Sequence, residues 1–99
     1  MKTIHKYQLQ ITDAQTIKMP RWAELLSAQF QGENLCVWAL VNTEEDVMED
    51  RVFRIFGTGH EIDVEIEDPE RDFNYGSFKF LATAQQPTIP LVWHIFYKI

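Results

Sequence analysis

The chain has 99 residues, of which 45% are hydrophobic and 13% aromatic, so it can build one hydrophobic core and has too few residues for a second. The single cysteine excludes an internal disulfide and a cysteine-based zinc site, which is typical of a reducing compartment. The opening MKTIHKYQLQI lacks the apolar stretch of a signal peptide, and glutamines and prolines interrupt the uncharged residues 80–97. We therefore expect one soluble, cytoplasmic domain over residues 1–99.

The formal net charge of −6 is unevenly distributed along the chain. Residues 43–72 hold twelve of the fifteen acidic residues against three arginines, and the rest of the chain has a small positive excess. An acidic segment of this kind argues against direct binding to nucleic acid or to an anionic membrane, because phosphates require the opposite charge. A protein partner with a basic surface is compatible with it.

Alternation of apolar and polar residues predicts strands in the first half of the chain. Residues 4–11 place Tyr7 and Leu9 on one face, and residues 16–20 form a short strand closed by Pro20. Residues 23–30 and 35–42 are two apolar runs around the sequence QGEN, which predicts a hairpin. The sequence RWAELL at residues 21–26 could alternatively begin a helical turn.

The second half of the chain continues this pattern. Residues 35–41 and 91–99 are apolar on both faces, which predicts central strands of a sheet covered on both sides. Residues 42–51 are expected to form an acidic loop or one helical turn, residues 68–77 an exposed connection, and residues 78–83 another strand. The fold class predicted from these elements is all-β, a small and mostly antiparallel sandwich or barrel of six to eight strands with little helix.

The sequence GTGH at residues 57–60 has the glycines of a loop but not the motif of a nucleotide site. A dinucleotide fingerprint needs a third glycine and a following helix, and both are missing. We predict a hairpin loop between strands at 51–56 and 61–67, with Gly57 and Gly59 at positive φ. The alternative is a small-ligand site made of the following residues: Gly57, Thr58, Gly59, His60, Arg51 and Arg54.

The predicted strand at 61–67 has an unusual density of carboxylates. Its apolar residues Ile62, Val64 and Ile66 are expected to point inward, and the four acidic residues between them outward, namely Glu61, Asp63, Glu65 and Glu67. This arrangement fits either protection of a sheet edge or a docking surface for a basic partner. The docking surface would be completed by the acidic residues of the preceding loop, Glu44, Glu45, Asp46, Glu49 and Asp50.

No arrangement of catalytic or metal-binding residues is visible in the sequence. The three histidines are far apart, no G-x-S-x-G motif occurs, and Cys36 lies in a strand that we expect to be buried. We therefore expect no enzyme activity, no cofactor and no metal. Trp22 follows a proline and lies between charged residues, so we predict that it is exposed at a protein interface. This interface could be that of a homodimer. Trp38 and Trp93 are predicted to lie in the core.

Four segments together resemble a family of small uncharacterised proteins from phages and prophages. They are KYQLQITDAQTIKMP, WALV, RVFRIFGTGH and LVWHIF, and the block R-x-F-x-I-x-G-T-G-H is the most specific of them. The resemblance implies a phage accessory protein that is cytoplasmic in the host cell, and it implies no activity, cofactor or catalytic residue.

Three functions follow from these observations. The first is a non-enzymatic protein of phage type that binds and inhibits a host protein through its acidic surface, plausibly a component of an antiviral defence system (anti-CRISPR-like). The second is an oligomeric binder that sequesters a signalling nucleotide at residues 57–60. The third is a structural or virion-associated role.

Overall fold

The computed structural model describes residues 1–67 and 77–98, which form seven β-strands and no helix. The strands are, in order, β1 (Lys2–Leu9), β2 (Ala14–Pro20), β3 (Glu24–Gln31), β4 (Asn34–Asn42), β5 (Met48–Gly57), β6 (Lys79–Gln85) and β7 (Val92–Lys98). The prediction of an all-β fold with six to eight strands is confirmed. Among the described residues, no helix is long and apolar enough to cross a membrane.

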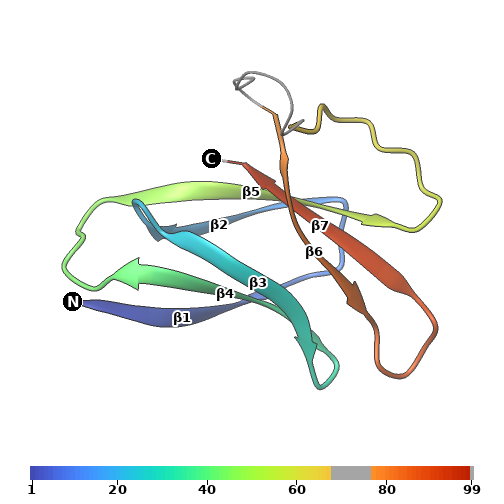
Figure 1. Cartoon of the computed structure of the whole chain (residues 1–99), viewed down its shortest axis with the longest axis horizontal. Helices are drawn as coiled ribbons and strands as arrows, with labels where there is room; N and C mark the ends of the chain where they lie inside the picture. The colour runs from blue at the N-terminus through green and yellow to red at the C-terminus, as the bar shows by residue number, and fades with distance from the viewer. Residues whose placement is uncertain (68–76, 99) are drawn as a thin grey trace.

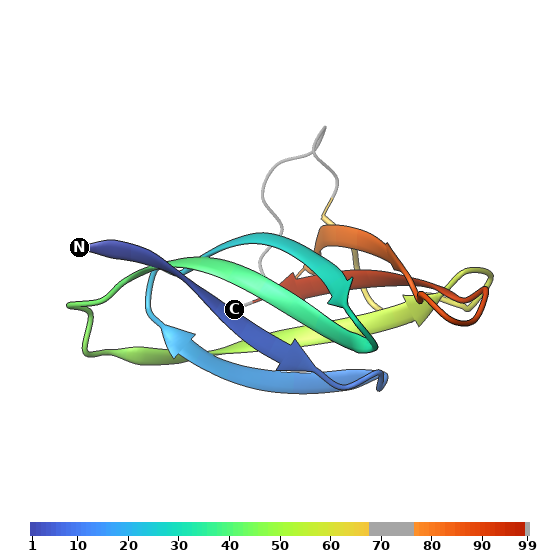
Figure 2. The same cartoon turned by 90° about the horizontal axis from the view of Figure 1, so that it is seen from below.

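The strands form two antiparallel sheets that pack face to face (Figures 1 and 2). The first sheet has the order β1-β4-β3 and the second the order β2-β5-β7-β6. The chain crosses between the sheets after β1, β2 and β4, and β3 lies in contact with β6 where the two sheets meet. The predicted central strands 35–41 and 91–99 correspond to β4 and β7, each of which has a neighbour on both sides.

The hydrophobic core lies between the sheets and follows from the period of two in each strand. Alternate residues of β4 and β5 point inward and are buried, joined by residues of the other strands: Leu35, Val37, Ala39, Val41, Phe53, Ile55, Leu9, Met19, Ala28, Ala84 and Ile95. Trp93 packs against this core as predicted. Trp38 does not, because it points to the outer face of the first sheet and is only half-buried.

A second, smaller apolar cluster covers the outer face of the second sheet. Phe56, Phe78 and Phe96 form it, with Phe56 and Phe96 in an edge-to-face contact at 5.8 Å. Val64 and Ile66, from the segment after β5, pack against these rings. The acidic segment 61–67 is therefore held to the sheet by these apolar contacts, by the Asp63–Arg54 ion pair and by backbone hydrogen bonds of Glu65 and Glu67 with Phe78.

The predicted hairpin at residues 23–42 is confirmed. Gln31 pairs with Asn34 in the register of β3 and β4, which leaves the two-residue turn Gly32-Glu33, and Gly32 has a φ of 60°. The alternative of a helical turn at 21–26 is wrong, because β3 begins at Glu24. The acidic loop predicted at 42–51 is shorter than expected, since β5 already begins at Met48.

The predicted strand at 61–67 is wrong. These residues form no strand, apart from one isolated bridge between Ile66 and Phe78, and Ile62 is exposed rather than inward. The topology excludes the expected hairpin with β5, because β5 already has β2 on one side and β7 on the other. The segment instead approaches the start of β6, where Ile66 forms its parallel bridge with Phe78. Residues 68–76 of the predicted connection lie outside the described part of the chain.

Candidate protein-binding surface

Trp22 is the most exposed of the three tryptophans, and its backbone is unusual. It lies in the turn between β2 and β3, where the Ala23 N–H donates to the Pro20 carbonyl at 3.1 Å. Its φ is 70°, in the left-handed region that normally requires glycine at this position of a turn. Its side chain is 76% exposed, so the prediction of an exposed Trp22 is confirmed.

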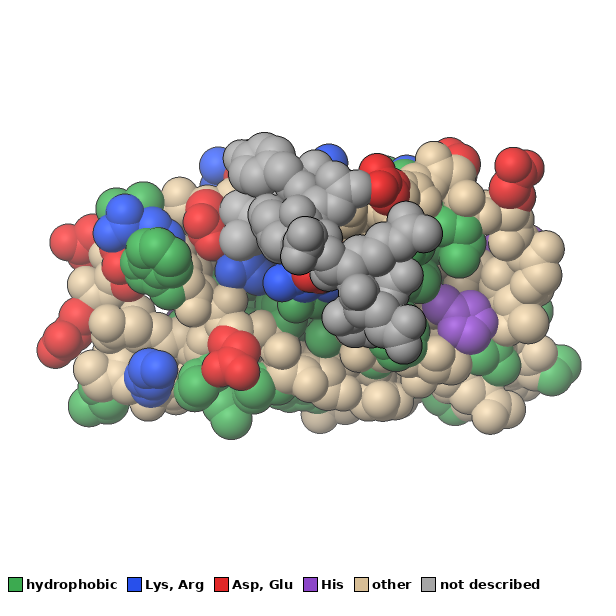
Figure 3. All heavy atoms as spheres, turned by 45° about the horizontal axis from the view of Figure 1, so that its top comes forward, with side chains coloured by type: hydrophobic (Ala, Val, Ile, Leu, Met, Phe, Trp, Pro, Cys, Tyr) green, Lys and Arg blue, Asp and Glu red, His purple; other side chains and the backbone are tan. Residues whose placement is uncertain are grey.

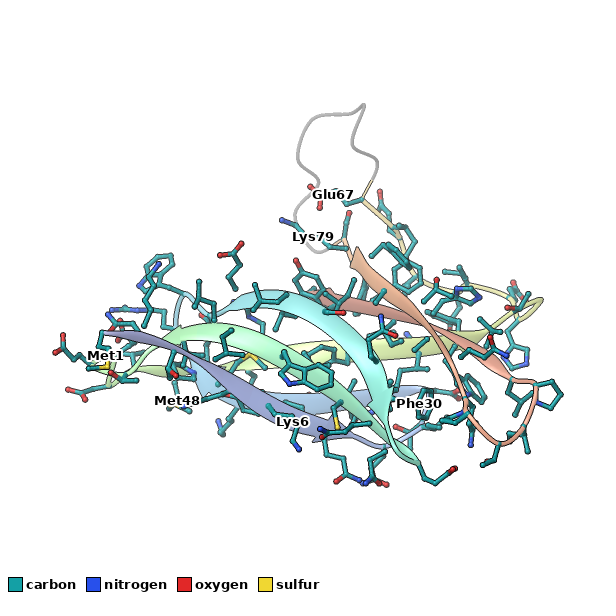
Figure 4. The ribbon with its side chains drawn as sticks, turned by 60° about the horizontal axis from the view of Figure 1, so that its bottom comes forward. Met1, Lys6, Phe30, Met48, Glu67 and Lys79 are labelled. Atoms are coloured by element: carbon teal, nitrogen blue, oxygen red, sulfur yellow. The ribbon has the colours of Figure 1, made fainter. Side chains whose placement is uncertain are left out.

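The loop between β4 and β5 lies directly beside this turn. The Arg21 N–H donates to the Val47 carbonyl at 2.8 Å, and Met48 pairs with Pro20 in the register of β2 and β5. Val47 is 46% exposed and Met48 50% exposed, so two further apolar side chains face solvent at this end of the molecule (Figure 4). We call Trp22, Val47 and Met48 the indole corner.

Acidic residues surround the indole corner. Asp46 is exposed and makes no ion pair or hydrogen bond among the described residues, whereas Glu45 lies 3.5 Å from Arg21 and also accepts the Val47 N–H. The remaining predicted acids of this loop are paired as well: Glu44 with the terminal amine of Met1, Glu49 with Arg51, and Asp50 with Lys18. The pairs of Glu44 and Asp50 are exposed and therefore weak, so these two carboxylates remain open to another cation. Glu45 and Glu49 are largely buried in their pairs.

Arg51 fixes the indole corner to the core. Its side chain is 5% exposed, donates to the Ala23 carbonyl at 2.7 Å and lies 3.2 Å from Glu49. The guanidinium therefore joins β5 to the turn that carries Trp22. This is a structural role that the sequence pattern did not reveal, because Ala23 and Arg51 are 28 positions apart.

Cation–π contact also holds the indole in place. The Arg21 guanidinium lies 5.3 Å from the centre of the Trp22 ring, and its Nη2 is within 3.5 Å of Glu45. Arg21, Val47 and Met48 were not predicted as site residues. The only sequence signal for the two apolar residues was their place inside the acidic run TEEDVMED, where solvated loops rarely carry adjacent apolar side chains.

The second predicted acidic group does not form one continuous surface with the first. Asp63 pairs with Arg54 at 2.7 Å, and Glu67 pairs with Lys79 at 3.7 Å (Figure 4). Glu61 is exposed and unpaired among the described residues, and Glu65 is exposed. Because residues 61–67 follow the far end of β5, about 30 Å of strand separates Glu61 from the indole corner. Figure 3 shows separate groups of acidic side chains on this face, at both ends and between them.

The sequence GTGH forms a self-contained turn that ends β5. The His60 N–H donates to the Gly57 carbonyl at 3.1 Å, and the Gly57 N–H donates to Nδ1 of the His60 ring at 3.1 Å. Gly59 has a φ of 88° as expected, but Gly57 does not have positive φ. The hairpin expected here is wrong, since residues 61–67 form no strand after the turn.

The remaining residues of the predicted ligand loop do not converge. Thr58 shares a hydrogen bond with Nε2 of His94 at 2.8 Å, and Thr83 shares one with Nδ1 of the same ring at 2.9 Å. Arg54 lies on the outer face of β5, whereas Arg51 points between the sheets on its inner face. The two guanidinium groups therefore cannot approach one ligand from the same side.

Comparison with known families identifies the chain by sequence. The chain belongs to the family described as Domain of unknown function (DUF7352), whose model matches residues 1–99. No curated protein and no solved structure matches the chain. The family supplies no activity, ligand or partner, so the functional argument depends on the geometry above.

Proposed function

We propose that this member of the family is a non-enzymatic binding protein that acts by occupying a partner protein. Its docking surface is the indole corner together with the surrounding acidic residues Glu44, Glu45 and Asp46. The observation that carries this proposal is the conformation of Trp22, a large apolar side chain that is 76% exposed on a left-handed backbone. Neither feature stabilises the isolated chain.

The energetic argument has two parts. A non-glycine residue with left-handed φ costs about 1 kcal/mol or more, and such strain persists mainly at functional sites. An exposed tryptophan also gains nothing from burial until a partner covers it. Tryptophan and arginine are the residues most enriched at the centres of interfaces, and here Arg21 already lies against the indole face.

The acidic residues define the partner. Asp46 is unpaired among the described residues and the pair made by Glu44 is exposed, so these two residues present negative charge at the rim of the corner. Glu45 is 15% exposed and is paired with Arg21. The complementary surface is an apolar pocket that accepts the indole, with lysine or arginine side chains around it. Such a surface occurs on proteins that bind nucleic acid, and nucleic acid itself would be repelled.

The biological form of this proposal is a phage accessory protein that inhibits a host protein in the cytoplasm, such as a component of an antiviral defence system. Its support is the resemblance of the R-x-F-x-I-x-G-T-G-H block to small phage proteins, together with the absence of any catalytic arrangement in the sequence. A small-ligand binder has less support, because Arg51 and Arg54 lie on opposite faces of β5. A virion-associated role would require the protein in purified particles.

A matched pair of charge reversals tests the location of the surface. Asp46 and Glu61 are both exposed, unpaired among the described residues, and at opposite ends of β5. We expect Asp46→Lys to reduce capture of the partner from host lysate by the tagged protein, and Glu61→Lys to leave it unchanged. Capture by the unmodified protein should also decrease as salt is raised.

The opposite pattern has a distinct meaning. If Glu61→Lys abolishes capture and Asp46→Lys does not, the docking surface is the segment 61–67 and not the indole corner. If neither reversal changes capture at any salt concentration, the acidic residues only keep the protein soluble.

A further inference from the structure

The outer face of the first sheet carries apolar side chains that no described element covers. Ile4, Leu40 and Glu24 lie side by side in one row across β1, β4 and β3, and Lys6, Trp38 and Ser27 form the next row. Ile4 is 56% exposed, and Leu40 and Trp38 are half-buried. This face borders the indole corner, because Glu24 follows Trp22 by two residues and Lys2 pairs with Asn42, where the loop that carries Val47 begins.

The same face divides into two halves of different chemistry. Near Asn34 its polar side chains are satisfied by one another, because Lys6 donates to Gln31 at 2.6 Å and Gln8 donates to Asn34 at 3.1 Å. Figure 4 shows Lys6 on β1. The other half holds the apolar residues Ile4 and Leu40, and there no such network occurs within the described residues. Only this second half is available for a partner.

The charges at the two edges of the apolar half have opposite sign. Lys2 lies on β1 and Glu24 on β3, both are exposed, and neither has an ion-pair partner among the described residues. The pattern across the face is therefore a positive edge, an apolar centre and a negative edge. A surface with this pattern is complementary to itself after a rotation of 180° about the direction of β4.

We propose that the outer face of the first sheet is the interface of a symmetric homodimer. A two-fold axis parallel to β4 places β1 of one copy over β3 of the other. Lys2 lies one row, about 7 Å along the strand, from the row of Glu24, so the long lysine side chain reaches Glu24 of the other copy across that offset. Leu40 then lies over Leu40 of the other copy, Ile4 packs on the methylene groups of Glu24 in the same row, and Trp38 lies in the next row. Two sheets packed in this way keep their strands nearly aligned, as in other face-to-face sheet packings.

The size of the face sets the strength of the dimer. Three strands of about eight residues cover roughly 14 Å by 27 Å, or about 400 Å² of flat area, of which the apolar half is about 200 Å². A stable standard interface buries about 800 Å² per partner, so the face alone is too small for a tight complex. We expect reversible association that increases with protein concentration.

Sedimentation velocity over a concentration series, at low salt, tests this interface with variants that leave the core intact. Ile4→Lys removes the exposed apolar side chain on an edge strand, and it should weaken association about a hundredfold, because a symmetric dimer loses one isoleucine from each copy at about tenfold each. Ile89→Lys is the matched control, because Ile89 is 43% exposed but lies in the loop between β6 and β7. That variant should associate like the unmodified chain.

A charge exchange tests the arrangement of the two copies. Lys2→Glu and Glu24→Lys should each weaken association, and the double variant should restore it, because each pair would be reformed with reversed signs. A chain that stays monomeric throughout the series would overturn the proposal. Association that resists Ile4→Lys, or a double variant that is not restored, would overturn this interface.

Discussion

At Gly57 the need for glycine comes from a neighbouring side chain and not from the backbone conformation. Its φ is not positive, so any residue could adopt the backbone conformation. The His60 ring occupies the space where a side chain would begin, and a Cβ atom on Gly57 would lie 2.8 Å from His60 Cε1. The glycine is therefore required by the turn that His60 closes.

This contact predicts the effect of Gly57→Ala. The added methyl group must displace the His60 ring and its hydrogen bond to the Gly57 N–H, so we expect a loss of about 1–2 kcal/mol in the free energy of unfolding. His60→Ala removes the obstacle, and the double variant should lose less than the sum of the two single variants. Urea unfolding of the four proteins measures this coupling.

Gly59 provides the control for that cycle. Its φ is 88° and a Cβ atom at this position would meet nothing within 4 Å, so Gly59→Ala should cost about 1 kcal/mol through backbone strain alone. His60→Ala should not relieve this cost. Equal coupling at both glycines would show that His60 acts on the whole turn and not by contact with Gly57.

Tyr7 predicts a change of stability at high pH. Burial raises the pKa of Tyr7 above its ordinary value of 10.0, so the folded chain holds the phenolic proton more tightly than the unfolded chain does. The stability from this group is complete below pH 10.0 and is lost as pH rises from the unfolded pKa through the folded one. The free energies of unfolding of the unmodified chain and of Tyr7→Phe, measured as a function of pH, should diverge only above that pH. A constant difference between the two at all pH values would contradict a raised pKa of Tyr7.

At the scale of elements, β5 carries two arginines with different energetic roles. Arg51 is buried between the sheets and bonds Ala23 and Glu49. Arg54 lies on the outer face with its side chain 17% exposed, donates to the Asp13 carbonyl and pairs with Asp63, which is 64% exposed. Removal of one partner from a buried pair leaves uncompensated polar groups, while exposed pairs contribute little.

The two arginines therefore predict unequal effects of the same substitution. We expect Arg51→Met to lower the free energy of unfolding by about 3 kcal/mol and Arg54→Met by about 1 kcal/mol. Arg51→Met should also loosen the turn that carries Trp22, which amide hydrogen exchange of Ala23 and Glu24 would report. Similar losses for both variants would show that Arg51 does not anchor the corner.

The strands could largely be predicted from the sequence, and the main error was the strand predicted at residues 61–67. Period-two patterns and short apolar runs together identified every strand of the described chain, because each strand has at least one face in a core. Residues 61–67 have the same pattern, and yet Val64 and Ile66 pack on the rings of Phe56 and Phe96 with one isolated bridge, from Ile66 to Phe78, in place of a strand. An alternating pattern of apolar and polar residues shows that one side of a segment is buried. Whether the segment also pairs as a strand depends on the order of the strands in the sheet, which the pattern does not contain.

At the scale of the whole molecule, the parts of the candidate surface were visible in the sequence but their arrangement was not. Trp22 and the acidic loop were each identified, from local composition. Their proximity depends on the pairing of β2 with β5, which brings Pro20 opposite Met48. The expected union of both acidic segments fails for the same reason, because β5 holds them apart. Long-range pairing of this kind has no signature in a single sequence.

The central claim is that Trp22 serves binding and not stability. The variant Trp22→Gly distinguishes these roles, because it should change the affinity for the partner without lowering the stability of the fold. Glycine adopts the φ of 70° without strain, so this variant should unfold at the same denaturant concentration as the unmodified chain or at a higher one. The measurement that decides is the dissociation constant of the captured partner. The account predicts that Trp22→Gly raises it about 30-fold or more, the effect of removing an interface anchor. An unchanged dissociation constant in the stably folded variant would contradict the account.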